Sequence, residues 1–434
     1  MVEDCMSRLA GVRSISGLWV GSILGAGFAF LSQVVLARSL GATAFGYFSA
    51  ALTLVTIVSP LAGFGVQNFW LKAFAEEGWN AIRWLKGSVK FVAVSTFSLF
   101  AALVGWTFLT GDDEQGFRLG LILSMLVFGQ VGLELVAAKL QLEERYPAMA
   151  MWLLLPHVLR FALVTVLVLF IDGGPSLERV ALAYCAVALA YFFISARSIS
   201  GMLKGRLSLY GQKPEVSSFG FEDIPSATSV AARAWPFGGA AVFYLVYSQI
   251  SVVALKYQAG ADVAGLYNVA VVIMTAVYIF PGVVYQRFMM SKLHRWFNSN
   301  VELLRKAYVY GNYLMLLLGG GAMLTVWLLA PFIPFIFGEE YSASIPFLML
   351  LAVAAPVRFV SSSVASFLTA VGMEKVKLRV MGGTSILSVL LNFSLIPAFG
   401  GVGAASAALV VELGMLMALF LIARNKLKNM AGEV

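Results

Sequence analysis

Long apolar segments follow one another along almost the whole chain. They give twelve predicted spans of about 20 residues, the length that a helix needs to cross the hydrocarbon core of a bilayer. The spans lie at residues 15–37, 45–68, 88–110, 117–138, 149–171, 179–199, 235–257, 265–286, 308–330, 345–371, 380–399 and 403–423. The runs are continuous and do not alternate, which excludes a barrel of short membrane strands. The pattern predicts an all-α polytopic membrane protein of about 12 transmembrane helices, with connections too short for a soluble domain.

Composition agrees with this pattern and removes several classes of function. Of the 434 residues, 60% are hydrophobic and 12% charged, whereas soluble chains have about 45–50% and 25%. The two cysteines, Cys5 and Cys185, offer no disulfide framework and no Cys-rich metal site. The sequence has no Gly-x-x-x-x-Gly-Lys-Ser/Thr phosphate loop. We therefore predict no metal, no cofactor and no nucleotide hydrolysis by that route, so that any transport is secondary or downhill.

The net charge of +8 is informative through its distribution. An even number of spans puts both termini on one side, and that side carries most of the 30 Lys and Arg residues. The other side carries only Arg38, Arg118, Arg179 and Lys256. The positive-inside rule then predicts cytoplasmic termini. Nucleic-acid binding is not expected, because no segment is long and polar enough to form a basic domain.

The longest connection divides the chain near its middle, since residues 201–234 are rich in Gly, Pro and Ser. We predict an N-terminal six-helix lobe at 1–200, a cytoplasmic linker at 201–234 and a C-terminal six-helix lobe at 235–434. A shift of 219 residues aligns Ser32–Phe69 with Ser251–Phe288, and twelve of the 38 aligned positions match, among them Gly41/Gly260 and Gly46/Gly265. Six spans per half make this a parallel repeat, with the substrate site between the lobes. The alternative is that any two apolar hairpins look alike.

Two motifs resemble a known family. The first is LARSLGATAFGYF at residues 36–48, a turn rich in small residues between the first two spans. The second combines AVGMEK at 370–375 with LNFSLIPAFGGVGAA at 391–405, where an Asn, a Pro and three glycines are spaced across one span, a turn and the next span. Both are similar to segments of the O-antigen and polysaccharide flippases in the multidrug/oligosaccharidyl-lipid/polysaccharide (MOP) exporter superfamily. With the topology, the resemblance extends over nearly the whole chain.

The resemblance implies a function and partners. The expected protein is a flippase in the bacterial inner membrane, with two six-helix bundles that alternate in access. It moves glycan units linked to undecaprenyl diphosphate from the cytoplasmic to the periplasmic leaflet, for O-antigen, capsule or exopolysaccharide synthesis. Expected partners are the lipid-linked oligosaccharide, the bilayer lipids, and a polysaccharide polymerase and chain-length regulator. Such a protein is not an enzyme.

Ionisable residues inside spans are candidate functional residues, because they are costly there unless paired or hydrated. Four occur: Glu134, Arg160, Arg358 and Glu412. His157 is three residues before Arg160 and so shares its helical face. In one interpretation, Glu134 pairs with Arg160, and Glu412 pairs with Arg358, purely to join helices. In the other, the two arginines and His157 line a cationic lumen that receives a diphosphate, and Glu134 or Glu412 couples transport to an ion.

Uncharged polar residues add to the predicted lumen. They lie in the four spans that the repeat pairs, which line the central cavity in the family that the chain resembles, and they are Gln33, Asn68, Gln249, Asn268 and Gln286. Such groups can bond sugar hydroxyls, although each by itself also suits a helix–helix hydrogen bond.

Two rival functions follow from the sequence. A multidrug or cation antiporter of the same superfamily would need an acidic lobe, whereas the intramembrane charges are two Arg and two Glu. A membrane-embedded polysaccharide polymerase or acyltransferase would need an acid, base or nucleophile constellation on a sizeable outer loop. The predicted outer loops are short, and both histidines lie away from them.

Overall fold

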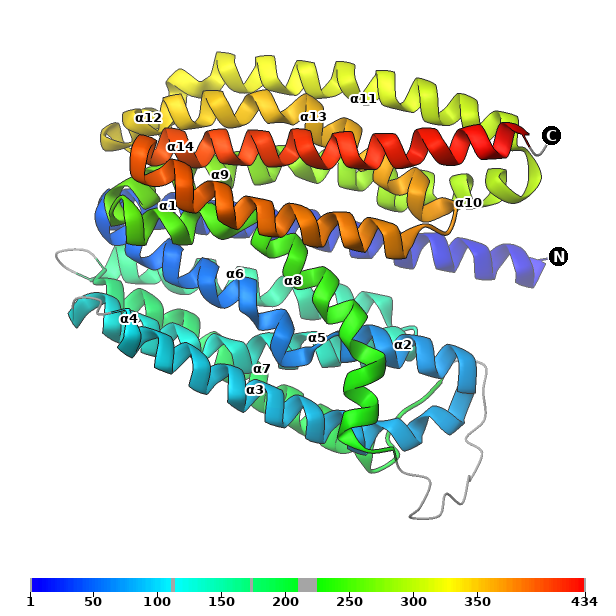
Figure 1. Ribbon diagram of the computed structural model, residues 1–434. Helices are drawn as coiled ribbons and strands as arrows, with labels where there is room; N and C mark the ends of the chain where they lie inside the picture. Colours follow the sequence, from blue (N-terminus) through cyan, green and yellow to red (C-terminus); the bar gives the residue numbers. More distant parts are fainter. Residues whose placement is uncertain (1, 111–113, 172–174, 210–224, 433–434) are drawn as a thin grey trace. The chain divides into compact units, whose positions relative to one another are not determined.

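The protein is described by a computed structural model that gives the backbone of residues 2–110, 114–171, 175–209 and 225–432. Side chains are not described for residues 1–18, 286–288, 291, 298 and 431–432. All regular structure in these ranges is helical, and no strand occurs in them. With the structural relatives reported below, this confirms the all-α membrane fold predicted from the apolar pattern (Figure 1).

The chain divides into two compact units whose borders differ from the simple halves of the sequence. Unit 1 is Met1–Leu40 with Leu54–Val242, and unit 2 is Gly41–Thr53 with Phe243–Val434. The ends of the predicted linker, residues 201 and 234, therefore both fall in unit 1. Most of that linker, residues 210–224, lies outside the described residues.

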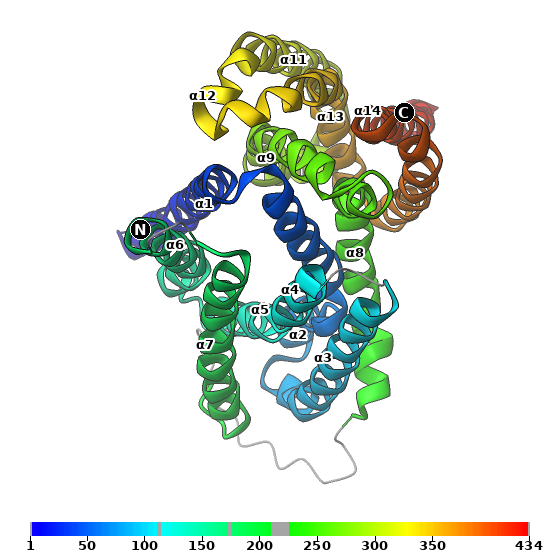
Figure 2. The ribbon, with the colours of Figure 1, turned by 90° about the vertical axis from the view of Figure 1, so that its left-hand side faces the viewer.

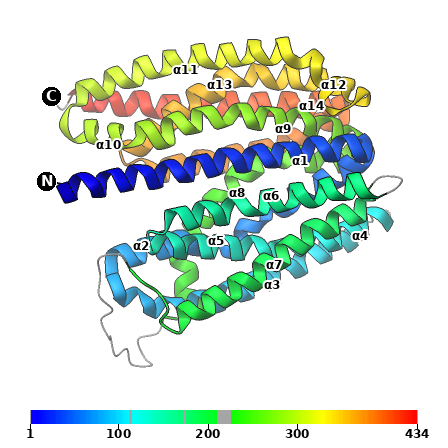
Figure 3. The same ribbon diagram turned by 180° about the vertical axis from the view of Figure 1, so that it is seen from behind.

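Unit 1 is built from helices in chain order. They are α1 (Val2–Gly63, apart from Gly41–Thr53), α2 (Val66–Glu77), the 3-10 turn η1 (Gly78–Ile82), α3 (Arg83–Leu109), α4 (Glu114–Ser124), α5 (Leu126–Leu142), α6 (Tyr146–Phe170), α7 (Leu177–Leu203) and the first half of α8 (Ala227–Gln258). Helices α5, α6 and α7 pack on one another and run side by side in the view from behind (Figure 3).

Unit 2 holds the Gly41–Thr53 segment of α1, the second half of α8 and the rest of the chain. The elements are α9 (Ala261–Gly282), the π-helix η3 (Val283–Met289), α10 (Met290–Ser299), α11 (Val301–Leu329), η4 (Ala330–Phe332), α12 (Ile333–Phe337), η5 (Glu339–Ser344), α13 (Ile345–Ala370) and α14 (Glu374–Gly432). Helix α13 packs against α9, α11 and α14 and is the central helix of this unit (Figure 2).

Nine helical stretches in the described part of the chain are long and apolar enough to cross a membrane. The first, Trp19–Leu109, contains three of the predicted spans, and the last, Glu374–Met430, contains two. The twelve predicted spans all overlap with these stretches, and none extends beyond them by more than four residues. Helices α1 and α14 are each interrupted once, at Gly41 (φ 75°, ψ 165°) and Gly400 (φ 55°, ψ −132°). Glycine adopts such positive φ values without steric cost, so the chain turns at a single residue where a loop is expected.

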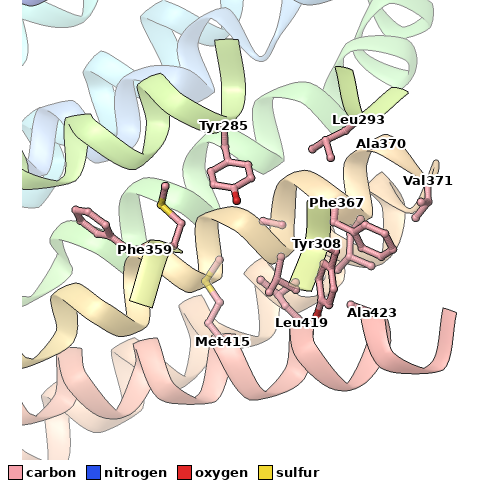
Figure 4. Close-up of a cluster of buried hydrophobic side chains, with 14 of the residues drawn as sticks. Tyr285, Leu293, Tyr308, Phe359, Phe367, Ala370, Val371, Met415, Leu419 and Ala423 are labelled. Carbon is pink, nitrogen blue, oxygen red and sulfur yellow. The ribbon is translucent and has the colours of Figure 1, made fainter. Parts of the chain in front are cut away.

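The core of unit 2 is aromatic and aliphatic. Tyr308 of α11 packs on Phe367 of α13 with ring centroids 4.7 Å apart. Leu419 and Ala423 of α14 belong to the same buried cluster (Figure 4). Helices α11, α13 and α14 are thereby held together near the start of α11 and the end of α14.

In unit 1, glycine allows two helices to approach closely. A Cβ added at Gly129 of α5 would lie 2.6 Å from the Cα of Ala188 in α7. Small residues at such contacts are the usual device for packing helices in membranes.

We expect Gly129→Leu to lower the free energy of unfolding by about 1–3 kcal/mol, because the new side chain overpacks the α5–α7 contact. The matched control is Gly105→Leu in α3, where an added Cβ meets nothing within 4 Å. Thermal unfolding in detergent measures both variants. Equal midpoints for the two would contradict this account of the contact.

Candidate functional site

Arg358 of α13 is the centre of a polar cluster within unit 2. Its guanidinium forms an ion pair with Glu412 of α14, through Nη1 and Oε1. Only 12% of the Arg358 side chain and 8% of the Glu412 side chain are exposed. The structure therefore contains the Arg358–Glu412 pair that the first interpretation of the intramembrane charges predicts.

Three tyrosines complete the surroundings of this arginine. The guanidinium carbon of Arg358 lies 4.9 Å from the ring centre of Tyr247, 5.2 Å from that of Tyr278 and 5.6 Å from that of Tyr244. Arg358 Nη2 also donates a hydrogen bond to the Tyr244 hydroxyl at 3.2 Å, and the Tyr247 hydroxyl donates one to Glu412 Oε1 at 2.7 Å. Aromatic faces stabilise a guanidinium without neutralising it. The second carboxylate oxygen, Glu412 Oε2, is buried without a hydrogen-bond partner.

Helix α14 positions α8, which carries two of these tyrosines. Ser385 Oγ donates to the Phe243 carbonyl at 2.6 Å, and Ser388 Oγ donates to the Tyr247 carbonyl at 3.4 Å. Asn392, which is fully buried, continues the row and donates to the Ser388 carbonyl at 2.8 Å. Buried hydroxyls that bond backbone carbonyls across helices fix their register in an apolar medium. These hydrogen bonds of Ser385, Ser388 and Asn392 therefore fix α8 so that its Tyr244 and Tyr247 lie beside Arg358.

The intramembrane charges of unit 1 are arranged differently. Arg160 of α6 lies over the ring of Tyr184 of α7, with its guanidinium carbon 5.0 Å from the ring centre. Its Nε is buried without a hydrogen-bond partner. His157, one turn earlier on α6, lies beside Gly25 of α1, where an added Cβ would be 3.3 Å from His157 Cδ2. Arg160 is thus a half-buried cation whose described contacts are aromatic.

Glu134 of α5 does not pair with Arg160 among the ion pairs of the described residues. Its Oε1 accepts a hydrogen bond from Gln130 Nε2 at 3.2 Å, as their spacing of four residues on one helix allows. An added Cβ at Gly63 would lie 3.2 Å from Glu134 Oε2. The two candidate carboxylates therefore differ, because Glu412 faces a guanidinium and Glu134 faces a neutral amide.

The uncharged candidates lie in both units. In unit 1, Gln33 is half-buried and its Oε1 has no hydrogen-bond partner, while Asn68 is exposed. In unit 2, Gln249 is half-buried and Asn268 is buried. The side chain of Gln286 lies outside the described residues. Their role in a lumen stays a prediction.

Sequence reasoning missed two further features. The first is the group of tyrosines around Arg358, which count as apolar residues in the hydropathy pattern, although Tyr244 and Tyr247 share a helical face.

The second is an aromatic and charged cluster in unit 1, where Glu77 Oε2 accepts hydrogen bonds from Trp84 Nε1 at 3.0 Å and Arg83 Nε at 3.2 Å. Arg233 of α8 stacks on Trp84, with its guanidinium carbon 4.5 Å from the ring centre. This contact secures the start of α8 to unit 1.

A family model described as polysaccharide biosynthesis protein matches residues 12–287, well over half of the chain. The chain belongs to this family. One relative of the chain is the lipopolysaccharide biosynthesis protein WzxC of Escherichia coli K12. It is 23% identical over 423 residues, which cover 93% of this chain and 78% of WzxC. The family match confirms the resemblance drawn from the first motif, while the second motif lies beyond the matched residues.

Solved structures show the same fold at low sequence identity. An inward-facing multidrug resistance MATE family transporter of the MOP superfamily aligns with a TM-score of 0.74 and 13% identity, covering 96% of this chain and 99% of the transporter. The lipid II flippase MurJ in an inward closed conformation aligns with a TM-score of 0.70 and 13% identity, covering 94% of this chain and 87% of MurJ. The protein is therefore a multi-pass membrane protein with the MOP exporter fold. The two solved structures are those of a transporter and a flippase.

Proposed function

We propose that the protein is a flippase for lipid-linked glycans. It moves units carried on undecaprenyl diphosphate from the cytoplasmic to the periplasmic leaflet of the bacterial inner membrane, for synthesis of a surface polysaccharide. The family match and the similarity to WzxC support a role in polysaccharide synthesis, and the fold is one that a lipid II flippase uses. A polysaccharide polymerase and a chain-length regulator are the partners that this role implies.

The observation that carries the proposal is the presence of one half-buried arginine in each unit, packed against aromatic rings. Arg160 and Arg358 present guanidinium groups whose faces are covered by tyrosines. A guanidinium matches the paired oxygens of a phosphate, and its attraction for an anion is strong where water is scarce. An organic cation, the cargo of a multidrug antiporter, would be repelled by Arg160, which has no carboxylate partner among the ion pairs of the described residues. Gln33, Asn68, Gln249, Asn268, Gln286 and His157 complete the proposed binding residues as partners for sugar hydroxyls.

Of the two carboxylates, Glu134 is the better candidate for ion coupling. Its described polar contact is the neutral side chain of Gln130, whereas Glu412 is held by Arg358 and Tyr247. A carboxylate that faces no cation can take up a proton or Na⁺ without first breaking an ion pair.

The direct test uses purified protein in proteoliposomes that contain a polyprenyl-diphosphate-linked oligosaccharide labelled on the sugar. Transfer between leaflets is read from the fraction of label that an added, membrane-impermeant sugar-modifying enzyme reaches. The proposal requires transfer well above that of empty liposomes, and loss of transfer in Arg160→Ala. Transport of cationic dyes with no transfer of the glycan lipid would instead favour the antiporter.

The proposed orientation has its own test. From the distribution of Lys and Arg, residues 112–115 and 339–341 should face the periplasm, and residues 204–214 the cytoplasm. Single cysteines placed in each segment should react with an impermeant maleimide in intact cells only in the first two. Labelling of the third segment in intact cells would reverse the topology.

A further inference from the structure

An apolar groove lies on the surface of unit 2, apart from the Arg358 cluster. Helices α11 and α14 form its walls and Val360 of α13 contributes to its floor. Its volume is about 720 Å³, which is in the range of sites that hold a small molecule. Most of its lining is aliphatic or aromatic, including Leu316, Leu413 and Phe420.

Polar groups follow a definite order along the α11 wall. Arg305, Tyr308, Asn312 and Leu316 are spaced by three or four residues, so they lie along one face of the helix. The Tyr308 hydroxyl and the Asn312 side-chain carbonyl oxygen are buried; the two side chains interact with each other, and neither oxygen has a further hydrogen-bond partner in the described part of the chain. From one end to the other, this wall presents a cation, a hydroxyl, an amide and then an apolar side chain.

The α14 wall is apolar along the groove and, like the α11 wall, has a cation at one end. Leu413, Met417 and Phe420 line the groove, and Arg424 comes one turn after Phe420 on the same face. Both Arg305 and Arg424 are exposed and belong to no ion pair among those of the described residues. The start of α11 and the end of α14 lie at the same end of unit 2 (Figure 3), so the two arginines flank the same end of the groove.

We infer that this groove binds an anionic glycerophospholipid of the leaflet on the Arg305 side. The lipid phosphate would meet Arg305 and Arg424, the glycerol ester region would meet Tyr308 and Asn312, and an acyl chain would lie along Leu316 and Leu413. From Arg305 to Leu316 a helix rises about 16 Å, close to half of the roughly 30 Å hydrocarbon core. That depth suits the acyl chain of one leaflet and is too short for a long polyprenyl chain. The inference does not depend on the glycan that the protein carries.

The test measures which lipid stays on the purified full-length protein. The protein is reconstituted in vesicles of equal parts phosphatidylglycerol and phosphatidylethanolamine, extracted with mild detergent, washed and analysed by native mass spectrometry. We expect bound phosphatidylglycerol to exceed phosphatidylethanolamine. Arg305→Gln with Arg424→Gln should lower that ratio about tenfold, because each basic residue adds to the attraction for an anionic lipid. Lys86→Gln with Lys90→Gln in unit 1, two exposed cations at the start of α3, should leave it unchanged.

A second pair of variants tests the apolar part without changing charge. Leu316→Trp fills the groove and should displace the lipid, whereas Leu317→Trp, the adjacent residue that is 74% exposed and outside the groove, should not. The inference is overturned if no lipid is retained, if both lipids are retained equally, or if the arginine variants bind as wild type does. It is also overturned if added undecaprenyl phosphate displaces phosphatidylglycerol, because the groove would then belong to the carrier lipid.

Discussion

Arg358→Ala should abolish glycan export in a complementation assay while the protein remains in the membrane. Two effects combine in this variant. The proposed phosphate contact is lost, and Glu412 becomes a buried carboxylate without its cation, which costs about 3–5 kcal/mol of stability. Export is measured as surface polysaccharide in a strain without its own flippase, and the amount of folded protein is measured by fluorescence-detected size exclusion.

A double substitution separates these two effects. Arg358→Ala with Glu412→Gln removes the stranded charge, so it should recover much of the stability, and we expect export to stay absent because the phosphate ligand is still missing. The Glu412→Gln variant alone is the control for the carboxylate. Recovery of export in the double variant would show that Arg358 serves only to hold Glu412, and would remove it from the proposed binding residues.

A disulfide between the two repeat-related turns should stop export. In unit 2, the Gly41–Thr53 segment of α1 packs on the start of α9, because an added Cβ at Gly46 would meet the Ala261 carbonyl oxygen and one at Gly265 would meet the Ala42 carbonyl oxygen. Thr43 and Asp262 are next in sequence to these contacts. In the proposed alternating access the two sequence repeats move against each other and this contact opens in one state, so Thr43→Cys with Asp262→Cys should trap the protein when oxidised.

The background for that experiment has Cys5 and Cys185 replaced by serine, and each single cysteine variant is a control. Export should return when the disulfide is reduced. Normal export by fully crosslinked protein would mean that the contact stays closed throughout the cycle. Failure of the two cysteines to bridge at all would contradict the packing of these turns.

The apolar pattern predicts the spans well because each one is long and nearly free of charge. The turn between the first two spans is where the small residues predict it, but it is narrower than the gap between the spans, because α1 continues through residues 38–44 and is interrupted only at Gly41. A single positive φ angle leaves no trace in hydropathy, although the glycines that supply it stand out in both motifs.

The candidate site shows the limits of sequence reasoning more clearly. Arg160 and Arg358 look alike in sequence, since each is a lone arginine in an apolar run. In the structure Arg358 meets a carboxylate and Arg160 meets Tyr184. Which partner an arginine meets depends on how each helix is rotated about its axis and which helix lies beside it, and one sequence does not specify either. The spacing of Tyr244 and Tyr247 was a readable signal, but their rings count as apolar in the pattern that defines a span.

Helix α8 has a consequence for how the chain assembles during synthesis. Its first half belongs to unit 1, where an added Cβ at Gly65 would lie 2.5 Å from the Gly238 backbone nitrogen. The earlier part of unit 1 therefore leaves the ribosome with a surface at Gly65 that only a later helix covers. When the linker is translated, the first six spans still lack the part of α8 that belongs to unit 1. Unit 1 can therefore be complete only after the ribosome has translated residue Val242. Each half of the sequence lacks a segment of the unit that it mainly forms, so we expect that neither half expressed alone gives a stable lobe.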